Sequence, residues 1–488
     1  MAGRVSRLNP GVVDVEDGAR LNVDRTRMMR PPLLVALLTL ALAATPVPAR
    51  QASPAGVPGV GEAQLTPAFW IGLQAQPERV ILDRAAIAAQ NAKLLQRDPS
   101  MHDLRALPST LDRARVAGWM APLSRLPTQP LYDVDGKPVP AATLRAIADN
   151  AALDAIPAQQ PTRYGLVVRR AALRGFPTAR RVFSANDDTD IDRFQESAEF
   201  PGTPVVIAHT SADGQWLFVI SPRYTAWTEK DNVAEGSAAQ VFGHVDRKPY
   251  RVVTGASVRT VFTPEQPALS QLQLDMGTRL PLATGLPPDR PVNGQAPYTS
   301  HVLELPLRDA GGTLQFAPAL LQKNTDTAAD YLPLTRANII RQAFKFLGER
   351  YGWGHAYDGR DCSGFVADVY RSMGVQLPRN TGQQATSPAL AHRVFTDRDS
   401  REDRLAAARA LQTGDLVYIP GHVMMVLGQY NGQPYVIHDV ASVSYRNAGG
   451  QRVRIKLNAV SVTPLLPLLS NDRQTFVDRM TSIVRIRQ

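Results

Sequence analysis

The stretch YGWGHAYDGRDCSGF, residues 351–365, contains Cys362, the only cysteine of the chain. The residues that follow, CSGFVADVYRSMG, place apolar side chains at spacings of three and four, as on the buried face of a helix. The free N–H groups and the dipole at a helix N-terminus favour the thiolate form of a cysteine there. The pattern therefore predicts either a nucleophilic thiol or a core cysteine that happens to begin a helix.

A thiol nucleophile needs a base, usually a histidine. The segment GDLVYIPGHVMMVLGQYNGQPYVIHDV, residues 414–440, predicts three strands joined by a Pro-Gly and an Asn-Gly turn. His422 opens the middle strand and His438 closes the last. A strict two-residue turn would place Asp439, rather than His438, on the face of His422, whereas a bulge would restore His438. Both residues stay candidates for the partner of His422.

Residues 331–445 resemble the NlpC-type cysteine peptidases of bacterial cell walls. Five pieces in family order carry the resemblance: YGWG, DGRDCSGF, LPRNTGQQ, GDLVYI with GHVMMVLG, and YVIHD. It implies an α+β, papain-like fold with the nucleophile helix packed on an antiparallel sheet. It also implies cleavage of peptidoglycan stem peptides, typically between γ-D-glutamate and a diamino acid. It makes Cys362 the nucleophile, His422 the base and His438 the orienting residue, with no metal or other cofactor.

The same resemblance assigns four residues to the substrate. Tyr351 would line the site, and Asp361, Ser363 and Thr381 would hold the substrate, including the free amine of an L-alanine end. A carboxylate facing an ammonium is a charge-assisted contact of ordinary type. The chain departs from the family at His355, where the second Gly of Trp-Gly-Gly is usual. We expect this histidine either to reshape the substrate pocket or to have no role.

The rest of the chain changes its pattern several times. Helical spacings precede about residue 160, and short β-type runs separated by Gly, Asp and Pro follow. The resemblance extends weakly to the SH3-like domains of multi-domain family members. We predict an export signal over 1–49, a linker over 50–62, a mainly helical domain over 63–160, SH3-like barrels over 161–240 and 241–329, and the peptidase domain over 330–488.

The predicted export signal has arginines before an apolar run, Leu33 to Ala44, and small residues after it. The run is well short of the roughly 20 residues that span a bilayer. We therefore expect export to the periplasm or cell envelope without a stable membrane anchor. In an oxidising compartment a single cysteine cannot form an internal disulfide, so it is either a buried small hydrophobe or a thiol kept for its reactivity.

Charge and composition limit the partners. The formal net charge is +10, but no basic run is interleaved with aromatics, which argues against nucleic acid. Residues 186–199 place carboxylates as in a calcium loop, but Arg193 stands where that loop needs Gly, so we expect no metal. We expect a monomer that acts on peptidoglycan or its stem peptides. Two alternatives stay open: an amidase that uses the same Cys–His pair, and a wall-binding protein with an inactive peptidase domain.

Overall fold

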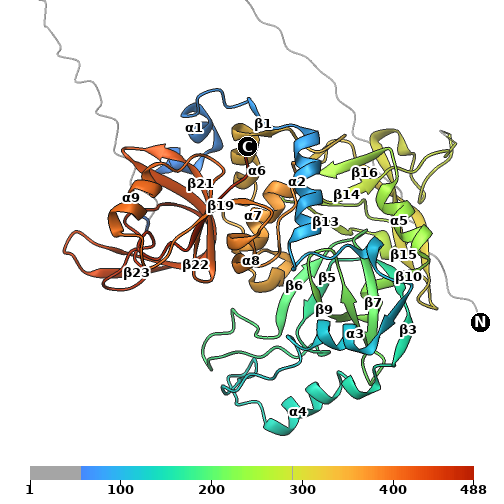
Figure 1. Ribbon diagram of the computed structural model, residues 1–488. Coiled ribbons are helices and arrows are strands. Elements are labelled where there is room, and N and C mark those ends of the chain that lie inside the picture. Colours follow the sequence, from blue (N-terminus) through green and yellow to red (C-terminus); the bar gives the residue numbers. More distant parts are fainter. Residues whose placement is uncertain (1–55, 288, 488) are drawn as a thin grey trace, which may run out of the picture. The chain divides into compact units, whose positions relative to one another are not determined.

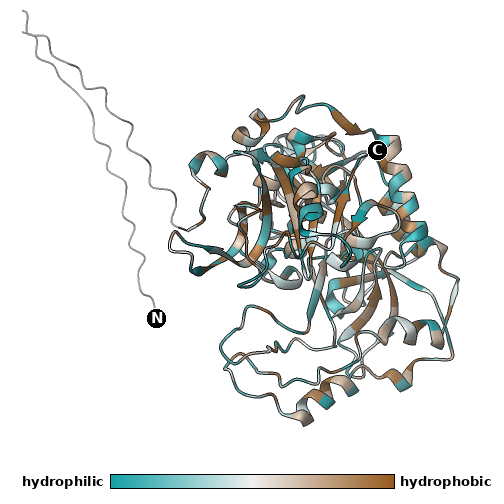
Figure 2. Cartoon of the chain, turned by 60° about the vertical axis from the view of Figure 1, so that its left-hand side comes forward, coloured by the Kyte–Doolittle hydropathy of each residue, from teal (hydrophilic) through white to brown (hydrophobic). Residues whose placement is uncertain are grey.

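The computed structural model describes residues 56–287 and 289–487 (Figure 1). The predicted export signal and the first residues of the predicted linker lie outside the described residues. Within the described ranges, no helix is long and apolar enough to cross a membrane. The chain mixes helices and strands as expected, and apolar residues gather on the strands while hydrophilic residues dominate the surrounding loops (Figure 2).

The C-terminal part is a six-stranded antiparallel sheet with helices on both faces. The strand order is β19-β24-β20-β21-β22-β23. The strands are β19 (Ala391–Val394), β20 (Leu416–Ile419), β21 (His422–Tyr430), β22 (Gln433–Arg446), β23 (Arg452–Pro464) and β24 (Ser482–Arg485). The helices are α6 (Arg336–Phe344), α7 (Cys362–Arg371), α8 (Thr381–Thr386) and α9 (Arg401–Arg409). Helices α6 and α7 share one apolar cluster with the sheet, and α9 shares a second cluster on the opposite face.

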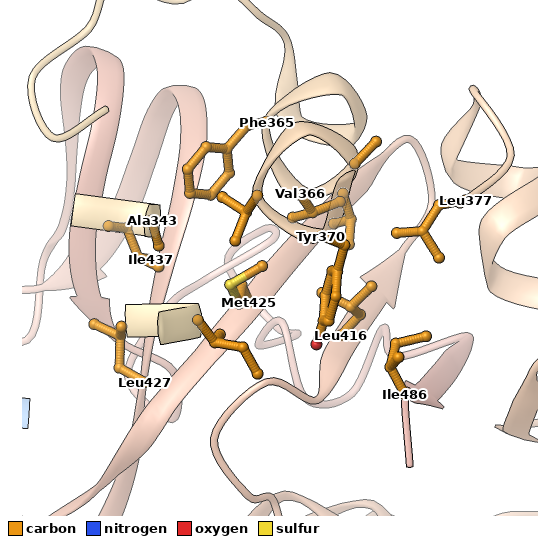
Figure 3. Packing of buried hydrophobic residues seen from close by; sticks show 14 of the residues in the cluster. Ala343, Phe365, Val366, Tyr370, Leu377, Leu416, Met425, Leu427, Ile437 and Ile486 are labelled. Carbon is orange, nitrogen blue, oxygen red and sulfur yellow. The ribbon is translucent and has the colours of Figure 1, made fainter. Parts of the chain in front are cut away.

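Helix α7 begins at Cys362 because Asp361 caps it. The Asp361 Oδ1 accepts a hydrogen bond from the Gly364 N–H at 2.8 Å, which satisfies one of the free donors of the first turn. The apolar stripe predicted from the sequence faces the sheet, where Phe365, Val366 and Tyr370 surround Met425 (Figure 3). Burying each such side chain contributes roughly 1.5–3 kcal/mol. This packing fixes the thiol beside the start of β21.

The helices before residue 160 are divided between two cores. Trp70 of α1 (Pro67–Gly72) and Ile87 of α2 (Arg84–Arg97) join the core of the C-terminal sheet. Strand β1 (Val80–Leu82) pairs with β18 (Leu334–Thr335). In contrast, α3 (Arg113–Met120) packs on the first barrel. Helix α4 (Ala141–Asp149) belongs to a small separate apolar cluster. Strand β2 (Thr110–Asp112) pairs with β3 (Gln159–Pro161). The predicted boundary at residue 160 stays a prediction.

The first predicted barrel is a seven-stranded sheet of order β10-β4-β7-β8-β9-β5-β6. Its strands are β4 (Arg163–Val167), β5 (Ala171–Arg174), β6 (Gln195–Glu199), β7 (Pro204–Thr210), β8 (Trp216–Ile220), β9 (Thr225–Glu229) and β10 (Val233–Gly236). The acidic loop before β6 turns inward: Asp192 Oδ2 accepts from Arg174 Nη1 at 2.9 Å. That carboxylate is therefore part of a buried ion pair.

The second predicted barrel consists of small sheets around its own apolar core. Its strands are β11 (Tyr250–Val253), β12 (Ser257–Arg259), β13 (Gln273–Asp275), β14 (Arg279–Pro281), β15 (Ser300–Arg308), β16 (Leu314–Gln322) and β17 (Thr327–Ala328). Helix α5 (Ala238–Asp246) precedes them and packs on the first barrel. The sheets are β14-β11-β17, β12-β13 and β15-β16.

A buried arginine, Arg360, joins the two barrels to the C-terminal domain. Its guanidinium donates to Asp368 at 2.8 Å, to Glu349 at 2.9 and 3.0 Å, and to Asp275 of β13 at 2.9 Å. Asp275 also accepts from Arg170, between β4 and β5, at 2.5 Å. Arg360 and Asp275 are 1% and 0% exposed, so this network holds the segment before Cys362 at a fixed place.

Replacing Arg360 by Met should strongly destabilise the protein. The variant leaves the buried Asp368 and Asp275 carboxylates short of partners, and breaking one side of a buried ion pair costs about 3–5 kcal/mol. The free energy of unfolding in urea measures this loss. The control is Arg105→Met, which removes an exposed pair with Asp246 and should cost about 1 kcal/mol or less. Equal losses for the two variants would contradict the role of the network.

Candidate active site

Cys362 lies at the first turn of α7 and is 5% exposed. Burial raises the pKa of the Cys362 thiol to about 12, and the adjacent Asp361 carboxylate adds to the rise. The backbone N–H of Val423, next to His422 on β21, and the Arg379 guanidinium shift the thiol pKa in the opposite direction but do not offset burial. The resting thiol is therefore protonated at neutral pH, so attack by sulfur requires a base that takes the proton.

His422 and His438, both singled out in the sequence, are in contact. The Nε2 of His422 lies 2.8 Å from the Nδ1 of His438. The Asn-Gly turn has two residues as predicted, but β21 carries a bulge between Val426 and Gly428. This bulge shifts the register by one residue and brings His438 to the face of His422.

His438 also contacts a threonine of the neighbouring strand. The Nε2 of the fully buried His438 lies 3.0 Å from the Thr463 Oγ1 of β23. Desolvation lowers the pKa of His422 to about 4 and that of His438 well below its usual value, so both rings are neutral at pH 7. When each Nε2–H donates, to His438 and to Thr463 respectively, the Nδ1 of His422 keeps a lone pair. That tautomer makes His422 a base.

Asp439, the alternative partner, faces α7 instead. It is fully buried, and burial, with the Asp361 and Glu349 carboxylates, raises its pKa well above the usual range. In the part of the chain that the structure describes, neither Asp439 carboxylate oxygen has a hydrogen-bond partner. Asp439 therefore does not hold His422 in this structure.

The four residues assigned to the substrate differ in their contacts. Arg379 donates to Asp361 Oδ2 at 2.8 Å and to Ser363 Oγ at 2.9 Å, so these two side chains form one buried cluster. Tyr351 is buried, and burial raises its pKa, with the ionisable groups of Cys362 and Asp361 nearby adding to the rise. Thr381 begins α8 and is half-buried. Sequence reasoning missed the role of Arg379, although it lies in the quoted LPRNTGQQ piece.

His355 lies against the first turn of α7. Its Nδ1 is 2.8 Å from Arg379 Nη2, and a Cβ added at Gly364 would lie 2.5 Å from its Cε1. The residue adopts left-handed backbone geometry, with φ at 64°, directly after Gly354 at φ 58°. Burial and the surrounding arginines lower the pKa of His355 well below its usual value. A neutral imidazole thus fills the space over the first turn of α7.

The first barrel borders this cluster through β6. The Oγ of Ser197 accepts from Arg379 Nε at 2.6 Å. The Gln195 side chain donates to the Gly354 carbonyl at 2.8 Å, and the Gln195 carbonyl accepts from the Trp353 indole at 3.0 Å. Strand β6 therefore fixes both Arg379 and the loop that carries His355.

Because the pKa of the Cys362 thiol is raised, we expect its rate of alkylation to keep rising with pH well above neutrality. Cys362 is the only cysteine, so uptake of iodoacetamide reports on one site. For the folded protein the rate should still rise about tenfold per pH unit up to pH 9.5, because the thiolate fraction keeps growing below the pKa. In guanidinium chloride the rate should level off above about pH 8.5, the ordinary cysteine pKa. A plateau below pH 8 in the folded protein would indicate a resting thiolate–imidazolium pair instead.

Cys362 begins a helix and His422 begins a strand of the antiparallel sheet, and the thiol lies at the backbone N–H of Val423, the residue after His422. A helix-borne cysteine packed on such a sheet with a strand-borne histidine is the papain-like class. Residues 348–460 match the NlpC/P60 family, and residues 180–229 match the SH3 domain of SH3b1 type. The chain therefore carries an NlpC/P60 domain preceded by an SH3b domain. The resemblance predicted from the sequence is confirmed, as is the mixed α+β fold class.

Two curated relatives share parts of the chain. It is 27% identical over 240 residues to the gamma-D-glutamyl-L-lysine dipeptidyl-peptidase of Bacillus cereus, covering 45% of this chain and 61% of that protein. It is 32% identical over 118 residues to the probable endopeptidase p60 of Listeria welshimeri, covering 23% of this chain and 19% of that protein. The chain thus spans less than two thirds of the length of either relative.

A solved structure shares the fold over most of the chain. An NlpC/P60 endopeptidase from Photobacterium damselae subsp. piscicida aligns with a TM-score of 0.68, covering 85% of this chain and 96% of that chain. The sequence identity is 18%, so the likeness shows the fold alone.

Proposed function

We propose that the protein is an exported cysteine endopeptidase that hydrolyses peptidoglycan stem peptides between γ-D-glutamate and a diamino acid, in cell-wall turnover or recycling. The observation that carries the proposal is the chain of contacts from His422 through His438 to Thr463. His422 is the first residue of β21, the strand whose start lies beside Cys362. The NlpC/P60 domain and the names of the curated relatives support the substrate class.

In this mechanism the Cys362 sulfur attacks the γ-glutamyl carbonyl while its proton passes to His422. The Cys362 N–H, at the first position of α7, has no intrahelical acceptor and can donate to the developing oxyanion. The amide C–N bond then breaks, and His422 returns the proton to the leaving amine. Water attacks the thioester and restores the free thiol, with His422 again accepting and returning the proton. His438 holds the His422 ring and the tautomer that this requires.

Asp361 and Ser363 would bind the free amine of an L-alanine end. In the structure the Asp361 carboxylate is already paired with Arg379 at 2.8 Å, so an ammonium would join an existing ion pair. The two carboxylate oxygens already accept from the Gly354 and Gly364 N–H groups, the Ser363 hydroxyl and Arg379, so the ammonium would replace one of these donors. We infer that Arg379 orients the carboxylate toward the amine.

Mass spectrometry of the full chain incubated with L-Ala-γ-D-Glu-diaminopimelate tests the proposal. Release of L-Ala-D-Glu would support endopeptidase action on free stem peptides. Parallel incubation with intact sacculi separates the alternatives. Cleavage there at the sugar–peptide junction would mean an amidase, and no product from either substrate would favour a wall-binding protein with an inactive domain.

A further inference from the structure

A cavity of about 250 Å³ lies between the first barrel, the second predicted barrel and the last residue of α7. Its charged lining is unbalanced. Three arginines and one acid face it: Arg223, Arg279, Arg371 and Glu199. Arg371 ends α7 and Cys362 begins it, and at 1.5 Å per residue these ends are about 14 Å apart. The cavity is therefore separate from the candidate active site.

Arg223 is a buried cation with an incomplete set of partners. Its side chain is 8% exposed, and its closest carboxylate oxygen, the Glu199 Oε2, is 3.6 Å away. The Glu199 Oε1 is bound by the Ser221 hydroxyl at 2.7 Å. No Arg223 nitrogen is among the buried side-chain atoms that lack a partner in the described residues, so the guanidinium reaches the open space of the cavity with donors available to a ligand.

The neighbouring guanidiniums add to the positive charge. Arg371 donates to the Met276 carbonyl and pairs with Asp368 at 3.0 Å, a carboxylate that it shares with Arg360. Arg279 donates to the Arg247 carbonyl at 2.9 Å, but its Nε has no partner within the described ranges. The positive charges facing the cavity thus exceed the negative ones.

Two further polar atoms of the lining are unsatisfied. The Thr278 Oγ1 and the His244 Nδ1 are buried and have no hydrogen-bond partner among residues 56–287 and 289–487. Burial, with Arg247 and Arg279, lowers the pKa of His244 to about 4, so its ring is neutral at pH 7. Buried polar groups are usually satisfied by protein, water or ligand. His244, Thr278 and Arg223 all line this cavity.

The remaining walls are apolar, with Phe200, Pro204, Pro222 and Pro281 around the arginines. The volume is that of about eight water molecules in the liquid. We propose that this cavity binds the oxyanion of a small organic acid, a carboxylate or a phosphate ester, with Arg223 as its principal ligand. The guanidinium fork matches such oxyanions in two-point contact, and the proline and phenylalanine walls suit a short carbon skeleton. The proposal does not depend on peptidase activity.

Titration calorimetry of the full chain with glutarate, and separately with glycerol 3-phosphate, tests the site and distinguishes the two oxyanion sources. One of them should bind with one-to-one stoichiometry at millimolar or lower concentration, and Arg223→Gln should weaken it at least tenfold. The control Arg169→Gln removes a half-exposed arginine at a different cavity and should leave the affinity within twofold. Equal weakening by both variants, or no binding of either probe up to 20 mM, would overturn the proposal.

A measurement on the unaltered protein covers the case in which Arg223→Gln fails to fold. Crystals of the full chain soaked in millimolar selenate should show an anomalous peak beside Arg223. Peaks only at exposed arginines would overturn the site. A peak in the cavity without binding of either organic probe in solution would mean an adventitious ion only, which also overturns the proposal.

Discussion

Replacing Cys362 by Ala is expected to abolish stem-peptide hydrolysis, with kcat/KM falling by roughly four orders of magnitude or more. The loss follows because no other cysteine exists to attack the carbonyl, and the His422 base then has no thiol to deprotonate. The fold should survive, since the variant removes one atom from a well-packed cluster that retains its aromatic and aliphatic members. Product formation by mass spectrometry and the urea midpoint together measure the two effects.

Cys362→Ser is the matched control because it keeps the size of the side chain and a hydroxyl in place of the thiol. A serine hydroxyl is a far weaker acid than a thiol, so the His422 base should activate it poorly and the variant should be almost as inactive. Hydrolysis that persists in both folded variants would show that the thiol is not the nucleophile, and the proposed mechanism would be wrong.

The spacing of apolar residues in the sequence correctly predicted helix α7. The run after Cys362 has its apolar residues at helical spacing, and α7 buries the same stripe on the sheet. The single cysteine and the order of short motifs also identified the family. These features depend on neighbours within a few residues, so they can be predicted from the sequence.

The partner of His422 could not be settled in the same way. The Asn431-Gly432 turn forms as predicted. Counting outward from that turn places Asp439 on the face of His422, but the bulge near Gly428 shifts the register and places His438 there instead. A bulge is one extra residue whose place depends on packing from both faces of the sheet, and alternation along one strand does not reveal it.

Contacts between distant segments were also missed. Ser197 and Arg379 meet across 182 positions of sequence. Val80 pairs with Thr335, which places the first helices on the C-terminal core. Such pairings arise from the tertiary arrangement and leave no periodic signal near either residue. The contribution of β6 to the candidate site was therefore unpredictable without an alignment of related chains.

Mutation can distinguish the two candidate partners of His422, which are His438 and Asp439. The residue that holds His422 should be the one whose loss lowers the activity. The structure bonds His438 to His422 at 2.8 Å and leaves Asp439 on the other face. His438→Ala should therefore lower kcat/KM by roughly 10²–10⁴-fold, since the base loses the group that fixes its ring and tautomer. Asp439 makes no hydrogen bond to His422, and burial raises its pKa, which favours the uncharged carboxyl. Asp439→Asn keeps the size of the side chain and should therefore change kcat/KM by less than about threefold.

Thr463→Val is a control variant for which we expect a smaller loss of activity than for His438→Ala. It removes the hydroxyl 3.0 Å from the His438 Nε2 while preserving the branched shape of the side chain. The His438 ring then keeps its hydrogen bond to His422 but loses its contact with the Thr463 hydroxyl. The expected loss in kcat/KM is about tenfold, because Thr463 acts on His422 only through His438. Activity that falls with Asp439→Asn and persists in His438→Ala would reverse the assignment and mean that the register of β22 differs when substrate binds.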